Sequence, residues 1–249
     1  ADAYVPWQEN SFPGLLGNVV ARLERKFGVQ VDSEDVRVAY RETITAKSSA
    51  EGRYKKQSGG HGQFGIASIR IEPLPAGSGL EFVDEVTGGA IPRQFITAVE
   101  AGVAEAMAQG GSSGYPVVDV RVAVVDGKHH SVDSSEMSFK MAGRLAFQEA
   151  LGGARCVVLE PVMAVEVTIP SECLGDVMGD LSSRRATVQG SELDRWGAQV
   201  ISAMAPEAEM LRYSIDLRSI TGGRGRFTAQ HDHYSRVPAG VEVPAPPEG

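Results

Sequence analysis

The sequence of 249 residues is too long for one small domain, so one large domain or two medium ones are expected. Hydrophobic residues make up 42% and charged residues 22% of it, which excludes a wholly disordered, collagen-like or coiled-coil protein. The formal net charge of −8, taken alone, argues against a generally basic nucleic-acid-binding protein. Net charge does not say where the charges lie, so that class stays open.

Hydrophobic periodicity predicts alternating helices and strands up to Gly152–Gly153, where we expect a domain boundary. The expected elements are a helix over 15–27, a strand over 36–44, a polar glycine-rich loop over 47–65, strands over 67–71 and 81–86, a helix over 93–109, a strand over 117–125, a polar loop over 126–131 and a helix over 133–151. Asp133 and Glu136, three residues apart, fit a capping box at the start of the last of these helices.

A smaller pattern follows the boundary. Its expected elements are a strand over 161–169, a helix over 174–181, strands over 186–189 and 198–205, a helix over 210–217 and a strand over 226–231. This β-α-β-β-α-β order is that of ferredoxin-like domains, so the predicted fold class is α+β. Residues 237–249 contain four prolines and few apolar anchors, and we expect them to form a disordered tail.

The two cysteines, Cys156 and Cys173, have no C-x-x-C partner. We interpret them as buried apolar side chains of a protein in a reducing compartment. No apolar run approaches the roughly 18 residues that a membrane span needs. Residues 1–10 lack the basic and apolar regions of a secretory signal. The cytoplasm is therefore the expected location.

The segment over 60–65, Gly-His-Gly-Gln-Phe-Gly, matches the G-x-G-x-x-G pattern of dinucleotide sites. Such a site needs a strand before it and a helix after it, whereas here a strand-like segment follows. We interpret it as a loop whose glycines let the backbone approach a partner closely. The surrounding segment, from Arg41 to Arg70, has a local charge of +4. This composition suits contact with phosphate and sugar, but an ordinary solvated loop would have it too.

A second polar loop contains Asp126, His129, His130 and Asp133, which are all possible metal ligands. Adjacent histidines rarely reach the same ion, and no third His or Cys lies nearby in the sequence. A histidine at a loop tip can instead stack on RNA or form a hydrogen bond with it. Both interpretations stay open at this point.

Arginines are frequent in the second predicted domain. Arg184, Arg185 and Arg224 are possible contacts for RNA, although surface solubility accounts for them equally well. The sequence has no G-x-x-x-x-G-K-[ST] phosphate loop, no G-x-S-x-G motif and no evident Cys/His pair. We therefore predict no catalytic residue, no metal and no cofactor in this chain.

Seven motifs resemble bacterial elongation factor G and occur in the order of that family between about Val19 and Tyr234. They are VAYRETI (38–44), KQSGGHGQFG (56–65), GYPVVD (114–119), VDSSE (132–136), LEPVM (159–163), GDVMGDL (175–181) and LRSIT with GR (217–224). The resemblance implies a C-terminal part of the factor. Residues 1–37 would hold an unmatched segment and the end of domain III, 38–158 a βαβ-type domain IV, and 159–236 a ferredoxin-like domain V.

The resemblance also implies a function. The chain would belong to a ribosome-binding translational GTPase that promotes movement of transfer RNA and messenger RNA, acting as a monomer. GTP and Mg²⁺ would bind a GTPase domain that this sequence lacks, so the fragment itself would hydrolyse nothing. The tip of domain IV would enter the decoding centre of the small subunit, and domain V would face the stalk base of the large subunit.

The residues expected at the tip of domain IV form two loops. The first comprises Lys56, Gln57, Ser58, Gly59, Gly60, His61 and Gln63, and the second comprises Lys128, His129, His130 and Ser131. The family usually has arginine where His61 stands and an aromatic residue where His129 stands. These departures, and the proline-rich tail, are more typical of an elongation factor G-like paralogue.

Two alternatives remain at the level of sequence. One is a ribosome recycling or ribosome protection factor of the same superfamily, although the loop around Gln57–Gly60 differs from that of the protection branch. The other is a metal- or nucleotide-dependent enzyme that uses His129, His130 and Asp133.

Overall fold

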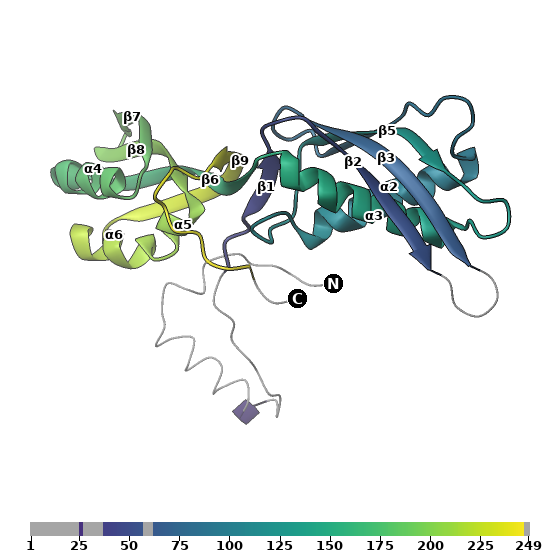
Figure 1. The fold of residues 1–249 in the computed structure, drawn as a ribbon. Coiled ribbons are helices and arrows are strands. Elements are labelled where there is room, and N and C mark those ends of the chain that lie inside the picture. Colours follow the sequence, from purple (N-terminus) through teal and green to yellow (C-terminus); the bar gives the residue numbers. More distant parts are fainter. Residues whose placement is uncertain (1–24, 27–36, 57–61, 247–249) are drawn as a thin grey trace. The chain divides into compact units, whose positions relative to one another are not determined.

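The computed structural model describes residues 25–26, 37–56 and 62–246 (Figure 1). Arg25 and Lys26 are helical, and the rest of the helix expected over 15–27 lies outside the described residues. The chain forms two compact units. The larger unit contains Tyr40–Leu159 and the C-terminal stretch from Tyr234, and the smaller unit contains Glu160–His233. None of the described helices is long and apolar enough to cross a membrane.

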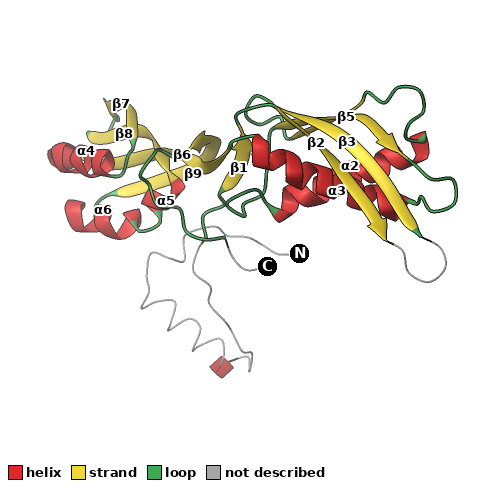
Figure 2. Ribbon diagram, in the orientation of Figure 1, coloured by secondary structure: helices red, strands yellow, loops and turns green. Residues whose placement is uncertain are grey.

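The larger unit is a four-stranded sheet with two helices on one face (Figures 1 and 2). Its elements are β2 (Ser48–Lys56), β3 (Gln63–Pro73), β4 (Leu80–Asp84), α2 (Arg93–Gln109), β5 (Val120–Lys128) and α3 (Glu136–Gly153). The strand order is β2-β3-β5-β4, and only the β4–β5 pair is parallel. Because α2 connects β4 to β5, these three elements form a βαβ unit. A short strand, β1 (Arg41–Ile44), pairs with Cys156–Leu159.

Small residues let α3 lie directly on the sheet. A Cβ atom on Gly52 of β2 would lie 1.9 Å from the carbonyl oxygen of Ala142, and one on Gly65 of β3 would lie 2.8 Å from that of Ser138. The two helices approach each other in the same way, because a Cβ on Gly143 would lie 2.5 Å from the carbonyl oxygen of Val99. The core of this unit therefore depends on backbone contacts as well as on large apolar side chains.

The smaller unit is a ferredoxin-like domain. Its elements are β6 (Cys156–Pro170, which begins in the larger unit), the 3-10 turn η2 (Ser171–Cys173), α4 (Leu174–Ser183), β7 (Thr187–Leu193), β8 (Ala198–Pro206), α5 (Glu207–Met210), α6 (Tyr213–Thr221) and β9 (Arg226–Arg236). β6 pairs with β8 and β9, and β8 pairs with β7. Val167, Val177, Ile201 and Leu217 join β6, α4, β8 and α6 in one core. The predicted α+β fold class is confirmed.

Three expectations about local structure are wrong. The segment over 47–65 contains β2 and the start of β3, not a continuous loop. The cap of α3 is Ser135, whose hydroxyl accepts a hydrogen bond from the Ser138 N–H at 3.2 Å, so Asp133 and Glu136 do not form a capping box. The helix expected over 210–217 is two helices, α5 and α6.

The C-terminal stretch also differs from the expected disordered tail. Residues 237–246 have no regular secondary structure, but they form hydrogen bonds with other parts of the protein. The Val237 N–H donates to the carbonyl oxygen of Val158 at 3.0 Å, and the Tyr115 hydroxyl donates to that of Pro244. These contacts join the stretch to the larger unit. Both cysteines are free, with Cys173 buried and Cys156 half-buried.

Candidate nucleic-acid interface

The first expected contact loop connects β2 to β3. Gln57, Ser58, Gly59, Gly60 and His61 lie outside the described residues, and Lys56 and Gln63 face each other in the last pair of the hairpin.

Two aromatic residues organise this end of the hairpin. The Tyr54 hydroxyl donates to Gln63 Oε1 at 3.0 Å, and the Lys55 ammonium lies 5.2 Å from the centre of the Phe64 ring. Cationic and amide groups therefore gather where the two strands end.

The second expected loop follows β5, and its side chains are exposed. Lys128 ends the strand, and His129 Nδ1 lies 3.2 Å from the carbonyl oxygen of Ala90. When Nδ1 carries the proton and donates to this carbonyl, Nε2 is left as an acceptor. His130 Nδ1 lies 3.2 Å from Asp133 Oδ2, and the His130 ring centre lies 6.3 Å from that of Phe64.

Asp133 and Ser134 hold the two loop regions together. The Phe64 N–H donates to the Asp133 carbonyl at 2.8 Å, and the Gly62 N–H donates to Asp133 Oδ1 at 3.1 Å. The Ser134 hydroxyl donates to the Phe64 carbonyl at 2.9 Å and accepts from the His130 N–H at 2.8 Å. The end of the hairpin and the loop after β5 therefore form one surface, which we call the tip (Lys55, Lys56, Gln63 and 128–131).

Two glycines of the G-x-G-x-x-G motif, Gly62 and Gly65, face the protein's own chain. A Cβ on Gly62 would lie 3.2 Å from the carboxyl carbon of Asp133, and Gly65 lies against α3. A strand, not a helix, follows the motif. At these two glycines the close approach is thus made by Asp133 and Ser138 of the same chain, not by a bound partner.

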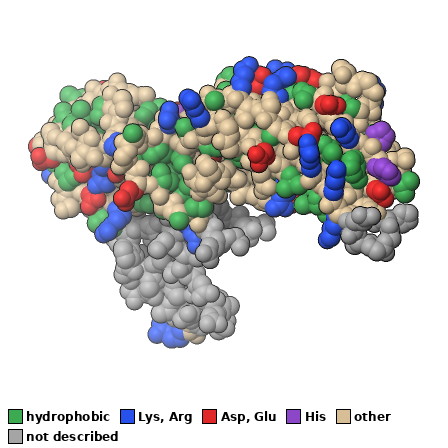
Figure 3. Space-filling model, viewed as in Figure 1, with side chains coloured by type: hydrophobic (Ala, Val, Ile, Leu, Met, Phe, Trp, Pro, Cys, Tyr) green, Lys and Arg blue, Asp and Glu red, His purple; other side chains and the backbone are tan. Residues whose placement is uncertain are grey.

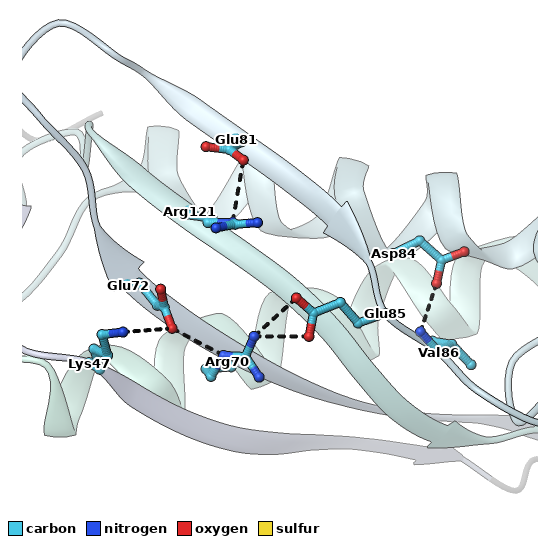
Figure 4. A network of polar contacts seen from close by, with 8 residues as sticks. All are labelled: Lys47, Arg70, Glu72, Glu81, Asp84, Glu85, Val86 and Arg121. Carbon is cyan, nitrogen blue, oxygen red and sulfur yellow. Dashed lines mark hydrogen bonds and ion pairs between the residues drawn. The ribbon is translucent and has the colours of Figure 1, made fainter.

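The positive charge of the segment from Arg41 to Arg70 is partly balanced on the outer face of the sheet. Lys47 pairs with Glu72 at 3.1 Å, and Arg70 pairs with Glu85 at 2.9 Å (Figure 4). Arg53 likewise pairs with its near neighbour Glu51.

Three basic side chains at the tip have no described ion-pair partner. Among the residues that the structure describes, no carboxylate pairs with Lys55, Lys56 or Lys128. Figure 3 shows histidines and basic side chains along this end of the larger unit. The tip is thus a local positive surface on a chain of net charge −8.

The two histidines of the tip contact different groups. His129 lies beside the Ala90 carbonyl, and His130 lies beside Asp133. Within the described parts of the chain, no three His, Cys, Asp or Glu side chains are grouped closely enough to hold a metal ion.

Two family models match the chain in succession. "Elongation factor G, domain IV" matches residues 36–155, and "Elongation factor G C-terminus" matches residues 157–242. The chain belongs to the elongation factor G family. It is a member of the translation-factor superfamily, and we refer to the larger unit as domain IV and the smaller unit as domain V.

A solved structure supports this assignment. A crystal structure of a protein from Thermus thermophilus has 39% sequence identity to the chain, matches it with a TM-score of 0.81 and covers 90% of it. The match covers 33% of the Thermus chain, so the present sequence spans about a third of the length of that protein.

The arginines of domain V that the sequence singles out are engaged within the domain to different degrees. Arg184 contacts Asp180 at 2.8 Å and Asp216 at 2.6 Å, and its side chain is 16% exposed. Arg185 forms two parallel hydrogen bonds with the buried Glu160, at 2.7 and 2.9 Å. Hydrogen bonds to Glu160 raise the pKa of Arg185 despite its partial burial. Arg224 pairs with Glu172 at 2.7 Å but stays 58% exposed, so it is the most accessible of the three.

Tyr213 provides a test of the packing beside Arg184. The Tyr213 side chain is fully buried, and its hydroxyl forms no hydrogen bond with any described residue. Tyr213→Phe removes this unsatisfied group, so we expect unchanged stability or a gain of up to about 1 kcal/mol in urea unfolding. Tyr54→Phe is the matched control, because its hydroxyl has a partner, and it should lose up to about 1 kcal/mol. A clear loss for Tyr213→Phe would show that the hydroxyl has a partner.

We also expect Tyr213 to make the stability of domain V depend on pH. Burial, with a smaller contribution from Asp180, raises the pKa of Tyr213 above its usual value of 10.0. Because the pKa of this hydroxyl is higher in the folded than in the unfolded state, the unfolded chain loses the proton at a lower pH than the folded chain does. The free energy of unfolding therefore keeps its full value below about pH 10 and falls as the pH rises further. Tyr213→Phe should therefore flatten the alkaline part of the stability curve of domain V.

The sequence did not predict the roles of Asp133 and Ser134 at the tip. It indicated Asp133 as a capping residue or a metal ligand, whereas the carboxylate holds Gly62 and His130. The available signal was the VDSSE motif, which places two short polar side chains directly after the tip histidines.

Proposed function

We propose that the chain is the domain IV and domain V part of a ribosome-binding translational GTPase that promotes movement of transfer RNA and messenger RNA. The tip would enter the decoding centre of the small subunit. One observation carries the proposal: hydrogen bonds that Asp133 accepts and that Ser134 accepts and donates hold the end of the β2–β3 hairpin and the loop with His129 and His130 as one surface.

The chemistry of the tip suits the backbone of RNA. Lys55, Lys56 and Lys128 offer ammonium groups to phosphates, and Gln63 and His129 offer groups that bind ribose hydroxyls. Contacts of this type read shape and 2′-hydroxyl groups, not base sequence, as a factor that acts on many transfer RNAs requires. The acidic remainder of the chain would disfavour loose binding elsewhere.

The hydrolysis of GTP belongs to another part of the parent protein in this proposal. GTP and Mg²⁺ would bind a separate GTPase domain, and we assign no catalytic residue to the present chain. Domains IV and V would act mechanically, through binding and positioning.

Substitutions at the tip test the proposal in the full-length parent. We expect His130→Ala and Lys128→Ala each to slow single-round translocation about 3- to 10-fold, which corresponds to roughly 0.7–1.4 kcal/mol. GTP hydrolysis on the ribosome should change less than twofold. Deletion of residues 57–60 should have a larger effect of the same kind.

Lys140→Ala is the matched control, because Lys140 pairs with Glu105 of α2, away from the tip. It should leave both rates unchanged. An equal loss of translocation and hydrolysis in the tip variants, or no loss of translocation, would contradict the proposal. Ribosome splitting measured on the same proteins distinguishes a recycling factor from a translocase.

A further inference from the structure

The turn between β7 and β8 presents the most exposed large apolar side chain among the described residues. Trp196 is 79% exposed. The turn beneath it is well ordered by hydrogen bonds, because Asp194 Oδ1 accepts from the N–H groups of Trp196 and Ala198, both at 2.8 Å. Gly197 has a φ of 79° and closes the turn, a conformation that suits glycine. The indole is therefore held in solvent by a defined turn.

A groove lies beside this indole. It is open to solvent, has a volume of about 460 Å³, and is lined by Trp196, Arg224, Arg226, Ser171 and Glu172 among others. This volume is within the range of roughly 300–1,000 Å³ found for small-ligand sites. One aromatic face with polar and cationic walls suits a ligand that is both flat and anionic.

Three arginines lie around the groove, which the carboxylates of Asp194 and Glu172 also line. The Arg195 guanidinium lies 5.1 Å from the centre of the Trp196 ring, and Arg224 and Arg226 line the groove. The carboxylate of Asp194 accepts two backbone hydrogen bonds within the turn. Glu172 pairs with Arg224, but both side chains are more than half exposed, so a phosphate could replace this carboxylate at little cost.

We propose that this groove binds an unpaired nucleotide of RNA, with the base stacked on Trp196 and the phosphate held by Arg224 and Arg226. The choice of RNA rests on the proposed function, whereas the site is separate from the tip of domain IV. A base within a duplex has both faces covered by its neighbours, so only an unpaired base can stack on the indole. Arg184 and Arg185 are paired with carboxylates inside domain V. We therefore assign the RNA contact of this domain to the groove and not to these two arginines.

Fluorescence tests the proposal directly. The sequence has two tryptophans, so Trp7→Phe leaves Trp196 as the only one. We expect a ten-nucleotide single-stranded oligoadenylate to quench this tryptophan in a saturable way, and a fully paired RNA duplex of the same length to quench it much less. A labelled copy of the same oligoadenylate measures binding in an anisotropy assay, where the variant needs no tryptophan. In this assay Trp196→Ala should weaken binding to domain V about 5- to 150-fold, the range measured for lost base stacking.

The arginines and a nearby apolar residue provide the remaining variants. Arg224→Ala and Arg226→Ala should each weaken the quenching titration and lower the slope of log K against log salt by about one. Leu193→Ser is the matched control, because Leu193 is 64% exposed at the end of β7 but does not line the groove. It should leave the titration unchanged.

The absence of saturable quenching, equal quenching by the duplex, or arginine variants that bind as well as the parent would overturn the proposal. A loss with Leu193→Ser equal to that with Arg226→Ala would also overturn it, and would favour an apolar protein partner. Lys128→Ala at the tip should leave Trp196 quenching unchanged. Translocation assays of the tip variants do not depend on the groove, so the failure of either proposal can be recognised separately.

Discussion

Gly52→Ala should prevent domain IV from folding normally or destabilise it by at least about 4 kcal/mol. The new Cβ would lie 1.9 Å from the carbonyl oxygen of Ala142 and 2.4 Å from the amide nitrogen of Ala146. Both atoms belong to the backbone of α3, so no side-chain rotation relieves the overlap, and the helix itself must move away from β2. Overpacking usually costs about 1–3 kcal/mol, and a clash with rigid backbone lies above that range. Thermal unfolding followed by circular dichroism should show a decrease of about 10 °C or more.

Gly152→Ala is the matched control for this substitution. Gly152 lies near the end of α3, and a Cβ there has no neighbour within 4 Å. Because alanine favours helix more than glycine does, this variant should be as stable as the parent or slightly more stable. If Gly52→Ala unfolded at the same temperature as Gly152→Ala, α3 would not lie on β2 as the structure describes.

The same close packing explains why β2 was not predicted from sequence. The sequence predicts α2 with its observed ends, because large apolar residues recur at helical spacing and Gly110 follows. In β2, by contrast, the inward positions are Ala50, Gly52 and Tyr54, and the outward ones are charged. Since α3 leaves no space for a side chain at Gly52, the centre of the strand lacks the large apolar residue that would make the alternation of apolar and polar residues recognisable.

At the tip, too, only part of the arrangement could be predicted from the sequence. The polar and basic character of the loops over 56–63 and 128–131 is visible in the sequence. The function of Asp133 is not, because its partners Gly62 and Phe64 lie about 70 residues earlier in the chain. Only the antiparallel pairing of β3 with β5 brings these segments together.

The net charge of −8 concealed the distribution that matters for function. Lys47, Arg53 and Arg70 are balanced by carboxylates on the sheet, and Arg184 and Arg185 by carboxylates inside domain V. Basic side chains that no described carboxylate pairs with include Lys55, Lys56 and Lys128 at the tip and Arg195 and Arg226 near Trp196. Counting charges along the sequence therefore overstates some candidate RNA contacts and misses others, because ion pairing depends on the fold.

Glu42→Ala should destabilise domain IV by about 3–5 kcal/mol, although the residue contacts no proposed partner. Glu42 is fully buried, and its Oε1 accepts hydrogen bonds from the N–H groups of Ser113 at 3.0 Å and Tyr115 at 2.9 Å. Its Oε2 accepts from the Ser112 hydroxyl at 3.2 Å. Alanine would leave these donors without their acceptor, and each lost hydrogen bond to a charged group costs about 1.5–3 kcal/mol. Urea unfolding measures the change.

Two further variants separate the hydrogen bonds from the negative charge. Glu42→Gln keeps one acceptor oxygen but turns an amide toward backbone donors. We therefore expect its free energy of unfolding to lie between that of the parent and that of Glu42→Ala. Glu81→Ala is the control, since Glu81 is 50% exposed and pairs with Arg121 at 3.3 Å, and it should cost less than about 1 kcal/mol. Burial raises the pKa of Tyr115, and the charge of Glu42 raises it further, so both Glu42 variants should titrate Tyr115 at lower pH than the parent. An unchanged titration of Tyr115, together with a small loss of stability, would show that Glu42 does not hold the loop over 112–115.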